Sequence, residues 1–324
     1  MTQLAIVQKA PVFMDKPKTI ELAVACVAEA AGKGANLIVF TEAFIPGYPA
    51  WIWRLRPGGD WNLSQELHQR LLDSAVVMDA DDLQPLYEAA RQHQVTIVCG
   101  IEERDSQLSK ATLYNSVITI GPDGTLLNKH RKLMPTNPER MVWGFGDATG
   151  LKVVDTPAGR VGSLLCWENY MPLARYALYA QGVEIYIAPT YDSGDGWLGT
   201  LQHIAREGCC WVIGCGNLMR GSDIPADFPA RDTLYPDADE WVSPGDSVVV
   251  APGGEIVAGP MNKQAGILYH TIDVKKVGIA KRALDVTGHY SRPDIFQLHV
   301  NTQQQTPCVF SNCHPREGGD PAGS

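Results

Sequence analysis

Three side chains that could act together in covalent catalysis each lie at or just beyond the end of a predicted strand. Cys166 follows residues 161–165, Glu42 follows Leu-Ile-Val-Phe-Thr at 37–41, and Lys132 ends the basic run Lys-His-Arg-Lys. A thiol can attack an electrophilic carbon once a carboxylate takes its proton, and an ammonium group can stabilise developing charge. Loops at the carboxyl ends of strands converge on a crevice in α/β sheets. The three residue types therefore indicate thiol-based nucleophilic catalysis.

Each of the three also has a simpler interpretation when it is taken alone. A free cysteine such as Cys166 usually fills space in a core. Glu42 can be an exposed carboxylate at a strand terminus, and Lys132 a solvated charge. If Glu42 is desolvated instead, its pKa rises and suits it to proton transfer. A strand end beside a helix start would favour the thiolate form of Cys166. The shared placement at strand ends favours the catalytic interpretation.

The surrounding elements follow from apolar periodicity and from breaker residues. Buried strands are predicted at 4–8, 36–42, 95–101, 161–165, 184–189 and 209–217. Helices are predicted at 15–32, 63–77, 82–93, 172–181, 197–207 and 272–283. Asp81 or Asp82 is the expected N-cap of the helix at 82–93.

Two hairpins of similar build lie among these strand–helix segments. The first joins 114–120 to 125–129 through Gly-Pro-Asp-Gly, and the second joins 247–251 to 255–258 through Pro-Gly-Gly. They predict two sheets with helices outside. The aromatic-rich segment 44–61 is expected to line a pocket or an interface, whereas 218–244 is expected to be a surface or interface loop. Residues 1–300 form the predicted domain, and the polar segment 301–324 the predicted mobile tail.

Composition narrows the class of protein. The chain has 45% hydrophobic and 19% charged residues and a net charge of -9. This charge argues against a nucleic-acid or anionic-membrane surface, and no apolar run is long enough to span a membrane. Eight cysteines without a secretion signal predict reduced thiols and a cytoplasmic location. Cys209, Cys210 and Cys215 are expected to pack in the core. A zinc site at Cys308, Cys313 and His314 is set aside because no fourth ligand is apparent.

The three motifs together resemble the Glu-Lys-Cys signature of the nitrilase superfamily, the carbon–nitrogen hydrolases, over about residues 3–300. They read Phe-Thr-Glu42-Ala, His-Arg-Lys132-Leu and Leu-Cys166-Trp-Glu-Asn. Trp167 directly after the cysteine is similar to the nitrilase branch, as are the segments at 44–49 and 288–294. The resemblance implies an α/β fold, a four-layer α-β-β-α sandwich with two mixed β-sheets. It also implies that Glu139 is a second, supporting glutamate, and that no cofactor or metal is required.

The same resemblance implies an activity and an assembly. The expected reaction converts an organic nitrile to a carboxylic acid and ammonia through a thioimidate and a thioester on cysteine. Substrate-binding rings are expected at Tyr48, Trp51, Trp167 and Tyr191. Subunits are expected to pair as homodimers that build a larger homo-oligomer or spiral. An amidase or cyanide-hydrating enzyme of the same superfamily is the main alternative, and a catalytically idle scaffold is the second.

Overall fold

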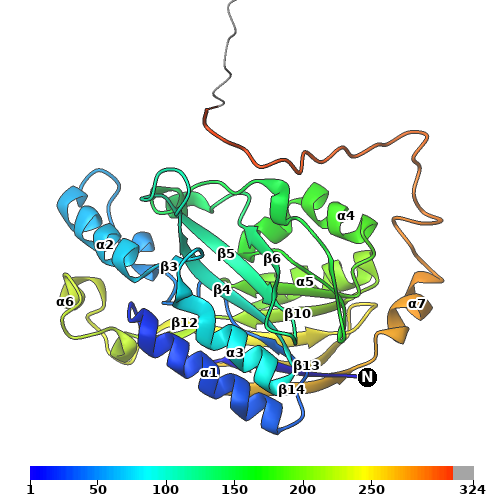
Figure 1. The fold of residues 1–324 in the computed structure, drawn as a ribbon, viewed down its shortest axis with the longest axis horizontal. Coiled ribbons are helices and arrows are strands. Elements are labelled where there is room, and N and C mark those ends of the chain that lie inside the picture. Colours follow the sequence, from blue (N-terminus) through cyan, green and yellow to red (C-terminus); the bar gives the residue numbers. More distant parts are fainter. Residues whose placement is uncertain (309–324) are drawn as a thin grey trace, which may run out of the picture.

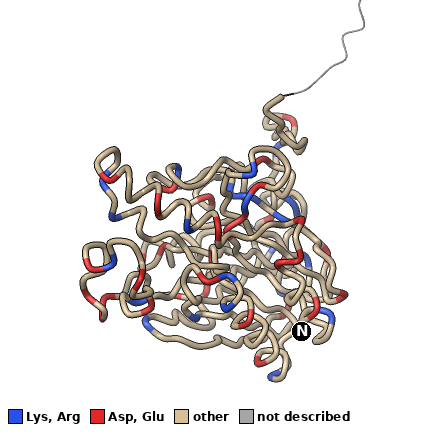
Figure 2. Tube along the Cα trace, turned by 60° about the vertical axis from the view of Figure 1, so that its left-hand side comes forward, with Lys and Arg blue, Asp and Glu red and all other residues tan. Residues whose placement is uncertain are grey.

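The computed structural model describes residues 1–308, which form two β-sheets with helices on their outer faces (Figure 1). Each sheet has seven strands and mixes parallel with antiparallel pairing. The predicted four-layer sandwich of two mixed sheets is confirmed. Acidic and basic positions are interspersed along the trace (Figure 2). No helix of the described residues is long and apolar enough to cross a membrane.

The first sheet has the strand order β14-β1-β2-β4-β5-β6, and β3 pairs with β4. Strands β1, β2 and β4 run parallel, whereas β5, β6 and β14 are antiparallel to their neighbours. Since β2, β4 and β6 bring distant parts of the chain into one layer, this sheet carries two of the predicted catalytic segments. Its strands are β1 Thr2–Gln8, β2 Leu37–Val39, β3 Val76–Val77, β4 Thr96–Arg104, β5 Leu113–Ile120, β6 Leu126–Arg131 and β14 Gly266–Ile272.

The second sheet has the strand order β11-β12-β10-β9-β8-β7, and β13 pairs with β12. Strands β8, β9 and β10 are parallel, and the other pairs are antiparallel. This sheet carries the predicted nucleophile after β8. Its strands are β7 Val154–Thr156, β8 Gly159–Ser163, β9 Ile185–Thr190, β10 Trp211–Gly216, β11 Leu218–Arg220, β12 Trp241–Val250 and β13 Ile256–Asn262.

Helices cover the outer face of each sheet because their apolar stripes need a partner surface. Helices α1 and α3 contribute to one buried cluster with the first sheet, and α4 and α5 to another with the second. Helix α1 begins after Asp15, whose carboxylate accepts the backbone N–H of Lys18 at 3.0 Å. The helices are α1 Lys16–Gly32, α2 Trp61–Ser74, α3 Gln84–His93, α4 Pro172–Ala180, α5 Asp195–Gly208, α6 Arg231–Leu234 and α7 Lys275–Lys281.

The inner faces of the two sheets meet in a dry, apolar core. Ile6 and Val39 from the first sheet belong to the same buried cluster as Ile187 and Ile213 from the second. Cys215 belongs to this cluster as well, and Cys209 and Cys210 are buried, so the predicted packing role of these cysteines is confirmed. Because interiors are close-packed, this core fixes the two sheets and the loops at their strand ends relative to one another.

Several predicted elements differ in detail from those observed. Both hairpins are present as β5–β6 and β12–β13. The helix predicted over 63–77 ends at Ser74, and a short strand β3 follows. Asp82 does not cap α3, because its carboxylate accepts Lys16 Nζ at 2.6 Å and the backbone N–H of Val77 at 2.9 Å. The start of the helix predicted over 272–283 belongs to β14, which the sequence analysis missed.

The segment 218–244 is more than the surface loop that was predicted. It contains β11, α6 and the start of β12, and several of its apolar side chains pack against α2 and the 48–55 segment. These buried side chains are Met219, Ile224, Phe228, Leu234, Tyr235 and Val242. The segment therefore adds a core of its own beside the sandwich.

The end of the chain is only partly described. Residues 301–308 are exposed and contain no helix or strand, and Cys308 is exposed. Cys313 and His314 lie outside the described residues. The predicted boundary between a domain at 1–300 and a tail at 301–324 stays a prediction.

Candidate active site

The three predicted catalytic residues meet where strands of both sheets end. Glu42 follows β2, Lys132 directly follows β6, and Cys166 follows β8 at the start of a 3-10 turn, Cys166–Tyr170. All three are buried, with exposed fractions of 0%, 1% and 4%. A carboxylate oxygen of Glu42, one of Glu139 and Sγ of Cys166 lie within 4.8 Å of one another. The structure brings the predicted residues together in one cluster.

Glu42 is held on both carboxylate oxygens. Its Oε1 accepts Asn115 Nδ2 at 2.7 Å and Lys132 Nζ at 2.9 Å, and its Oε2 accepts the backbone N–H of Tyr191 at 2.7 Å. Burial raises the pKa of Glu42 although the Lys132 ammonium opposes the shift. The predicted desolvated carboxylate is thus present, and the alternative of an exposed strand-end glutamate is wrong.

Lys132 lies between two carboxylates. Its ammonium donates to Glu42 Oε1 and, at 2.8 Å, to Glu139 Oε2. Burial acts to lower the pKa of Lys132, but the charge of Glu42 and the neighbouring acids outweighs it and raises that pKa. The ammonium therefore stays charged in the interior, which is the form that can stabilise negative charge.

Glu139 is fixed by the turn that carries it. Thr136 donates its backbone N–H to Glu139 Oε2 at 2.6 Å, at the start of the 3-10 turn Asn137–Met141. Tyr48 donates its hydroxyl to Glu139 Oε1 at 2.6 Å, and burial together with Glu139 raises the pKa of this phenol. Because Tyr48, Lys132 and Glu139 are buried, Glu139 ties the Lys132 ammonium to the wall of the pocket.

Cys166 has a left-handed backbone, with φ at 50°. This conformation is uncommon for a residue with a Cβ, and residues in such strained conformations cluster at active sites. Burial, Glu42 and Glu139 raise the pKa of the Cys166 thiol to about 12, against the opposing effect of Lys132. The prediction that the turn favours the thiolate is therefore wrong for the resting site. The thiol needs a base at the moment of attack.

Glu168 was not assigned a role from the sequence, yet it joins the two catalytic segments. Its carboxylate lies 2.9 and 3.0 Å from His130 Nε2 and accepts the backbone N–H groups of Leu133 and Leu165, both at 2.8 Å. His130 and Leu133 flank Lys132, whereas Leu165 precedes Cys166. A glutamate two positions after the nucleophile was the available signal, but its partners are distant in sequence.

Asn169 secures the same turn from the other side. Its Nδ2 donates to the carbonyls of Leu164 at 3.0 Å and Cys166 at 2.8 Å, and its Oδ1 accepts the Tyr186 hydroxyl at 2.6 Å. Buried polar groups that are fully paired rigidify the backbone around them. Glu168 and Asn169 together hold the unusual backbone of Cys166.

A further buried acid, Glu102 on β4, lies behind the cluster. Its Oε2 accepts Trp143 Nε1 at 2.6 Å, and its Oε1 has no hydrogen-bond partner among the described residues. Trp143 in turn lies under the Lys132 ammonium, 5.6 Å from ring centroid to Nζ, and edge-on to Tyr48. Burial raises the pKa of Glu102 well above 4.5. Glu102 therefore sets the orientation of the indole beside Lys132.

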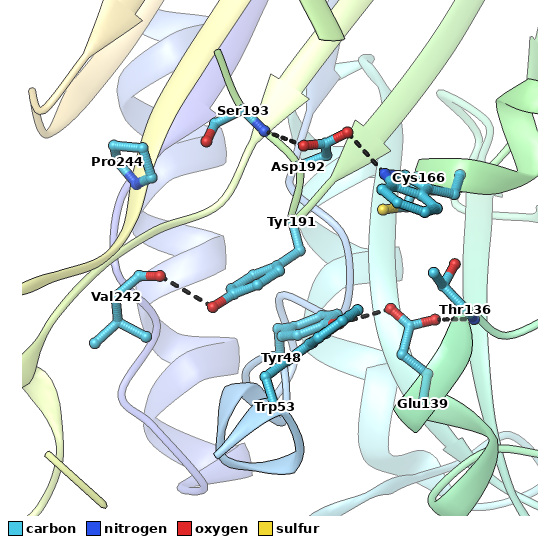
Figure 3. A pocket seen from close by; sticks show the side chains of 11 residues that line it. Tyr48, Trp53, Thr136, Glu139, Cys166, Tyr191, Asp192, Ser193, Val242 and Pro244 are labelled. Carbon is cyan, nitrogen blue, oxygen red and sulfur yellow. Dashed lines mark hydrogen bonds between the residues drawn. The ribbon is translucent and has the colours of Figure 1, made fainter. Parts of the chain in front are cut away.

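A cavity of about 250 Å³ opens onto Cys166 (Figure 3). Tyr48 and Tyr191 stack in its wall with centroids 4.1 Å apart and an angle of 5°. Trp167 lines the mouth and is 50% exposed. The lining residues are Tyr48, Trp53, Thr136, Glu139, Cys166, Trp167, Tyr191, Asp192, Ser193, Val242 and Pro244.

Trp51 is the one predicted ring that does not line this cavity. It is fully buried and packs with Leu67 and Leu71 of α2. Trp53 lines the pocket instead and donates its Nε1 to the Tyr48 hydroxyl at 2.9 Å. Both tryptophans belong to the short 3-10 turn Ala50–Trp53, which sends them to different sides. The prediction that segment 44–61 lines a pocket is confirmed for Tyr48 and Trp53.

The cluster of Glu42, Glu139 and Cys166 has the atoms that could ligate a metal ion. However, the Lys132 ammonium already lies within hydrogen-bond distance of both carboxylates. A cation between them would have to displace Lys132. The residues present suit an internal ammonium group better than a metal.

Similarity to known proteins identifies the family to which this α/β sandwich belongs. The chain belongs to the carbon-nitrogen hydrolase family, which matches residues 3–282. The bifunctional nitrilase/nitrile hydratase NIT4B of Nicotiana tabacum is 38% identical over 321 residues, covering 98% of this chain and 90% of the relative. An aliphatic nitrilase of Sinorhizobium fredii (strain HH103) is 40% identical over 313 residues, covering 94% and 97%.

A solved structure supports the fold. Saccharomyces cerevisiae Nit3, a member of branch 10 of the nitrilase superfamily, superposes with a TM-score of 0.70 at 20% identity, covering 89% of this chain and 96% of that chain. Family and fold predicted from the three motifs are therefore both confirmed.

Proposed function

We propose that this protein is a nitrilase that hydrolyses organic nitriles to carboxylic acids and ammonia, with Cys166 as the nucleophile. The observation that carries the proposal is the buried cluster in which Glu42, Lys132 and Glu139 surround the Cys166 thiol at the base of the cavity. The nitrilase names of relatives at 38% and 40% identity support the choice of nitrile over other carbon–nitrogen substrates.

The first half of the reaction forms a covalent intermediate. Glu42 takes the thiol proton as Cys166 attacks the nitrile carbon, and the nitrile nitrogen receives a proton to give a thioimidate. A raised pKa suits Glu42 to this exchange, since it makes the carboxylate a stronger base for the thiol proton. Lys132 and a backbone N–H near Trp167 stabilise the charge on nitrogen.

The second half consumes two waters. Glu42 activates the first water, which adds to the thioimidate carbon and gives a tetrahedral intermediate. Protonation of the nitrogen expels ammonia and leaves a thioester on Cys166. A second water, activated in the same way, releases the carboxylic acid and restores the thiol. Glu139 supports these transfers by holding Lys132 in position.

The tetrahedral intermediate can also break at the other bond. If it expels the Cys166 thiol instead of ammonia, the product is an amide. Which bond breaks depends on which group receives a proton first, and Glu42 is the residue that exchanges protons in the proposed steps. A minor amide product is therefore part of the proposal. The bifunctional name of the tobacco relative is in keeping with two outcomes.

A nitrile panel tests the proposal directly. Purified wild-type protein is incubated with aliphatic, aryl and arylaliphatic nitriles, with the matching amides and with free cyanide, and acid, amide and ammonia are measured. We expect acid and ammonia from nitriles in excess of any release from amides. Preference for an amide or for cyanide would favour the alternative enzymes. Absence of turnover together with no labelling of Cys166 by a thiol-reactive electrophile would favour an idle scaffold.

We further propose that the protein assembles as homodimers within a larger homo-oligomer or spiral. Large apolar side chains are exposed around α4 and the chain that follows α7, among them Leu173 at 66% and Phe296 at 77%. Such clusters often mark interfaces. Light scattering on purified protein tests this assembly, and a monomer would contradict it. A cytoplasmic location stays a prediction from the sequence.

A further inference from the structure

The formal charges that line the cavity all have the same sign. Among its eleven lining residues, Glu139 and Asp192 are acidic, and no lysine, arginine or histidine of the described chain is included. The nearby ammonium of Lys132 is held between Glu42 and Glu139 and is itself buried. A substrate entering from the mouth therefore meets carboxylates without an unpaired cation.

Asp192 is the charged residue at the mouth, and its side chain is fixed there. Its Oδ2 accepts Trp167 Nε1 at 2.7 Å, and its Oδ1 accepts the backbone N–H of Ser193 at 2.8 Å (Figure 3). Its own N–H donates to Thr190 Oγ1 at 2.8 Å, where β9 ends. These contacts place the carboxylate beside the indole that follows the nucleophile.

The loop that carries Asp192 is anchored from the neighbouring strand. Asp246 of β12 accepts the backbone N–H of Gly194 at 2.8 Å, and Asn262 of β13 donates to the same carboxylate at 2.7 Å. Asp246 is 5% exposed. The loop is thus held by a buried acid, which supports the position of Asp192.

We propose that Asp192 is a specificity-determining residue that restricts the site to nitriles without a carboxylate near the cyano group. The inference rests on the proposed nitrilase function. The substrate class is neutral aliphatic or arylaliphatic nitriles, and an ammonium-bearing nitrile is tolerated. An anionic substituent would lose its hydration on entering the cavity and would face the Asp192 carboxylate, while the buried Lys132 ammonium is already paired with Glu42 and Glu139.

The expected size of this discrimination follows from the geometry. The cavity is about 250 Å³, so a short substrate cannot hold a carboxylate far from its walls. Two like charges a few ångströms apart near a protein surface repel strongly enough to lower kcat/KM by about tenfold or more. Trp167 would remain in place for neutral substrates, because its hydrogen bond to Asp192 is unaffected.

Three nitriles of similar length test the proposal. They are 4-cyanobutanamide, 4-cyanobutanoate and 5-aminopentanenitrile, which are neutral, anionic and cationic at pH 7.5. Loss of each nitrile is followed by chromatography with the wild-type protein, Asp192→Asn, Asp192→Ser and the control Ser193→Ala. The control Ser193→Ala changes a side chain that lines the cavity. It keeps the backbone N–H of residue 193 that donates to Asp192.

We expect the wild-type protein to prefer the neutral amide to the carboxylate by about tenfold or more in kcat/KM. Removal of the Asp192 charge in either variant should lower this ratio at least about threefold, and Ser193→Ala should leave it unchanged. Because each ratio is measured within one protein, partial loss of folded enzyme does not alter it.

Equal use of the amide and the carboxylate by the wild-type protein would overturn the inference while leaving the nitrilase proposal intact. An unchanged ratio in whichever Asp192 variant retains activity would do the same. Failure of the wild-type protein to consume any nitrile would contradict the proposed function as well.

Discussion

The inner part of the site and its mouth are built in different ways. Glu42, Lys132 and Glu139 are at most 1% exposed, and their charged atoms are paired with one another or with backbone and side-chain groups. At the mouth, Trp53 and Trp167 are 42% and 50% exposed. The inner groups lie at strand ends or in the turn after β6, and the aromatic side chains come from short turns. This difference indicates that the sandwich fixes the reaction chemistry, while side chains on short turns shape the entrance to the cavity.

Glu42→Gln should produce the largest effect of the inner variants. Glutamine keeps the shape and its amide oxygen can still accept hydrogen bonds, but it cannot take the thiol proton. We expect kcat/KM for a neutral nitrile to fall by about 10²–10⁴-fold. Glu29 is an exposed acid on α1 that pairs with Lys33. The variant Glu29→Gln is the control and should retain wild-type activity.

The pH dependence sharpens the same test. Since burial raises the pKa of Glu42, wild-type activity should fall as pH decreases through a value above the usual 4.5, because the base becomes protonated. This acidic limb belongs to the coupled cluster as a whole. Residual Glu42→Gln activity should lack it. If Glu42→Gln showed the wild-type rate and an unchanged acidic limb, Glu42 would not be the base.

Lys132→Met should have the second-largest effect on activity. The variant keeps the aliphatic stem but leaves Glu42 and Glu139 facing each other without the ammonium. We expect a loss of about 10²–10³-fold in kcat and a decrease in the free energy of unfolding of about 3–5 kcal/mol. Urea denaturation and steady-state kinetics measure the two effects.

Lys129→Met is the matched control on the same strand. Lys129 pairs with Glu103, away from the cavity lining. It should retain nearly all of its kcat. If Lys129→Met and Lys132→Met lost activity equally, the ammonium of Lys132 would have no special role.

Glu168→Gln tests whether the two catalytic segments are positioned together. The variant loses the carboxylate that contacts His130 and the backbone of Leu133 and Leu165. A small displacement of Lys132 relative to Cys166 should lower kcat by about 10–10²-fold with little change in KM. Glu184 also accepts a backbone N–H but lies before β9. The variant Glu184→Gln is the control. A rise in KM alone would argue against positioning.

Glu102→Gln should have the smallest effect, and it concerns stability. Burial raises the folded-state pKa of Glu102, so the folded protein favours the protonated form. The contribution of protonated Glu102 to the free energy of unfolding is fully present below the unfolded-state pKa. It is lost as pH rises toward the folded-state pKa. As pH rises above 4.5, the variant should therefore gain stability relative to wild type, on the order of 1 kcal/mol. A difference independent of pH, measured by urea denaturation, would contradict a neutral Glu102.

The sequence was most informative about the inner part of the site. Apolar runs ending on Glu42 and Cys166 predicted strand ends, and parallel strands place such ends at one edge. The two hairpins were also predictable because Gly and Pro mark their turns. In contrast, β14 was missed, because its residues read Gly-Ile-Leu-Tyr-His-Thr-Ile without flanking turn signals on both sides, and its partner β1 lies at the other end of the chain.

The mouth was harder to predict for a physical reason. Trp51 and Trp53 are two positions apart in one 3-10 turn, and local sequence does not determine which ring faces the core. Packing against α2 buries Trp51, while a hydrogen bond to Tyr48 holds Trp53 at the pocket. Likewise, His130 meets Glu168, and Trp167 meets Asp192, only once the chain is folded. Contacts of this kind need the three-dimensional structure.

The most direct test of the account is mass spectrometry of the acyl-enzyme. Wild-type protein is mixed with an excess of a neutral nitrile, quenched in acid during turnover and digested, and the peptide that contains Cys166 is analysed. The account predicts an added mass equal to the substrate's acyl group on Cys166, which disappears when the nitrile is consumed, and no adduct or ammonia release in Cys166→Ala. Turnover with the label on a different cysteine, or ammonia release by Cys166→Ala at the wild-type rate, would contradict it.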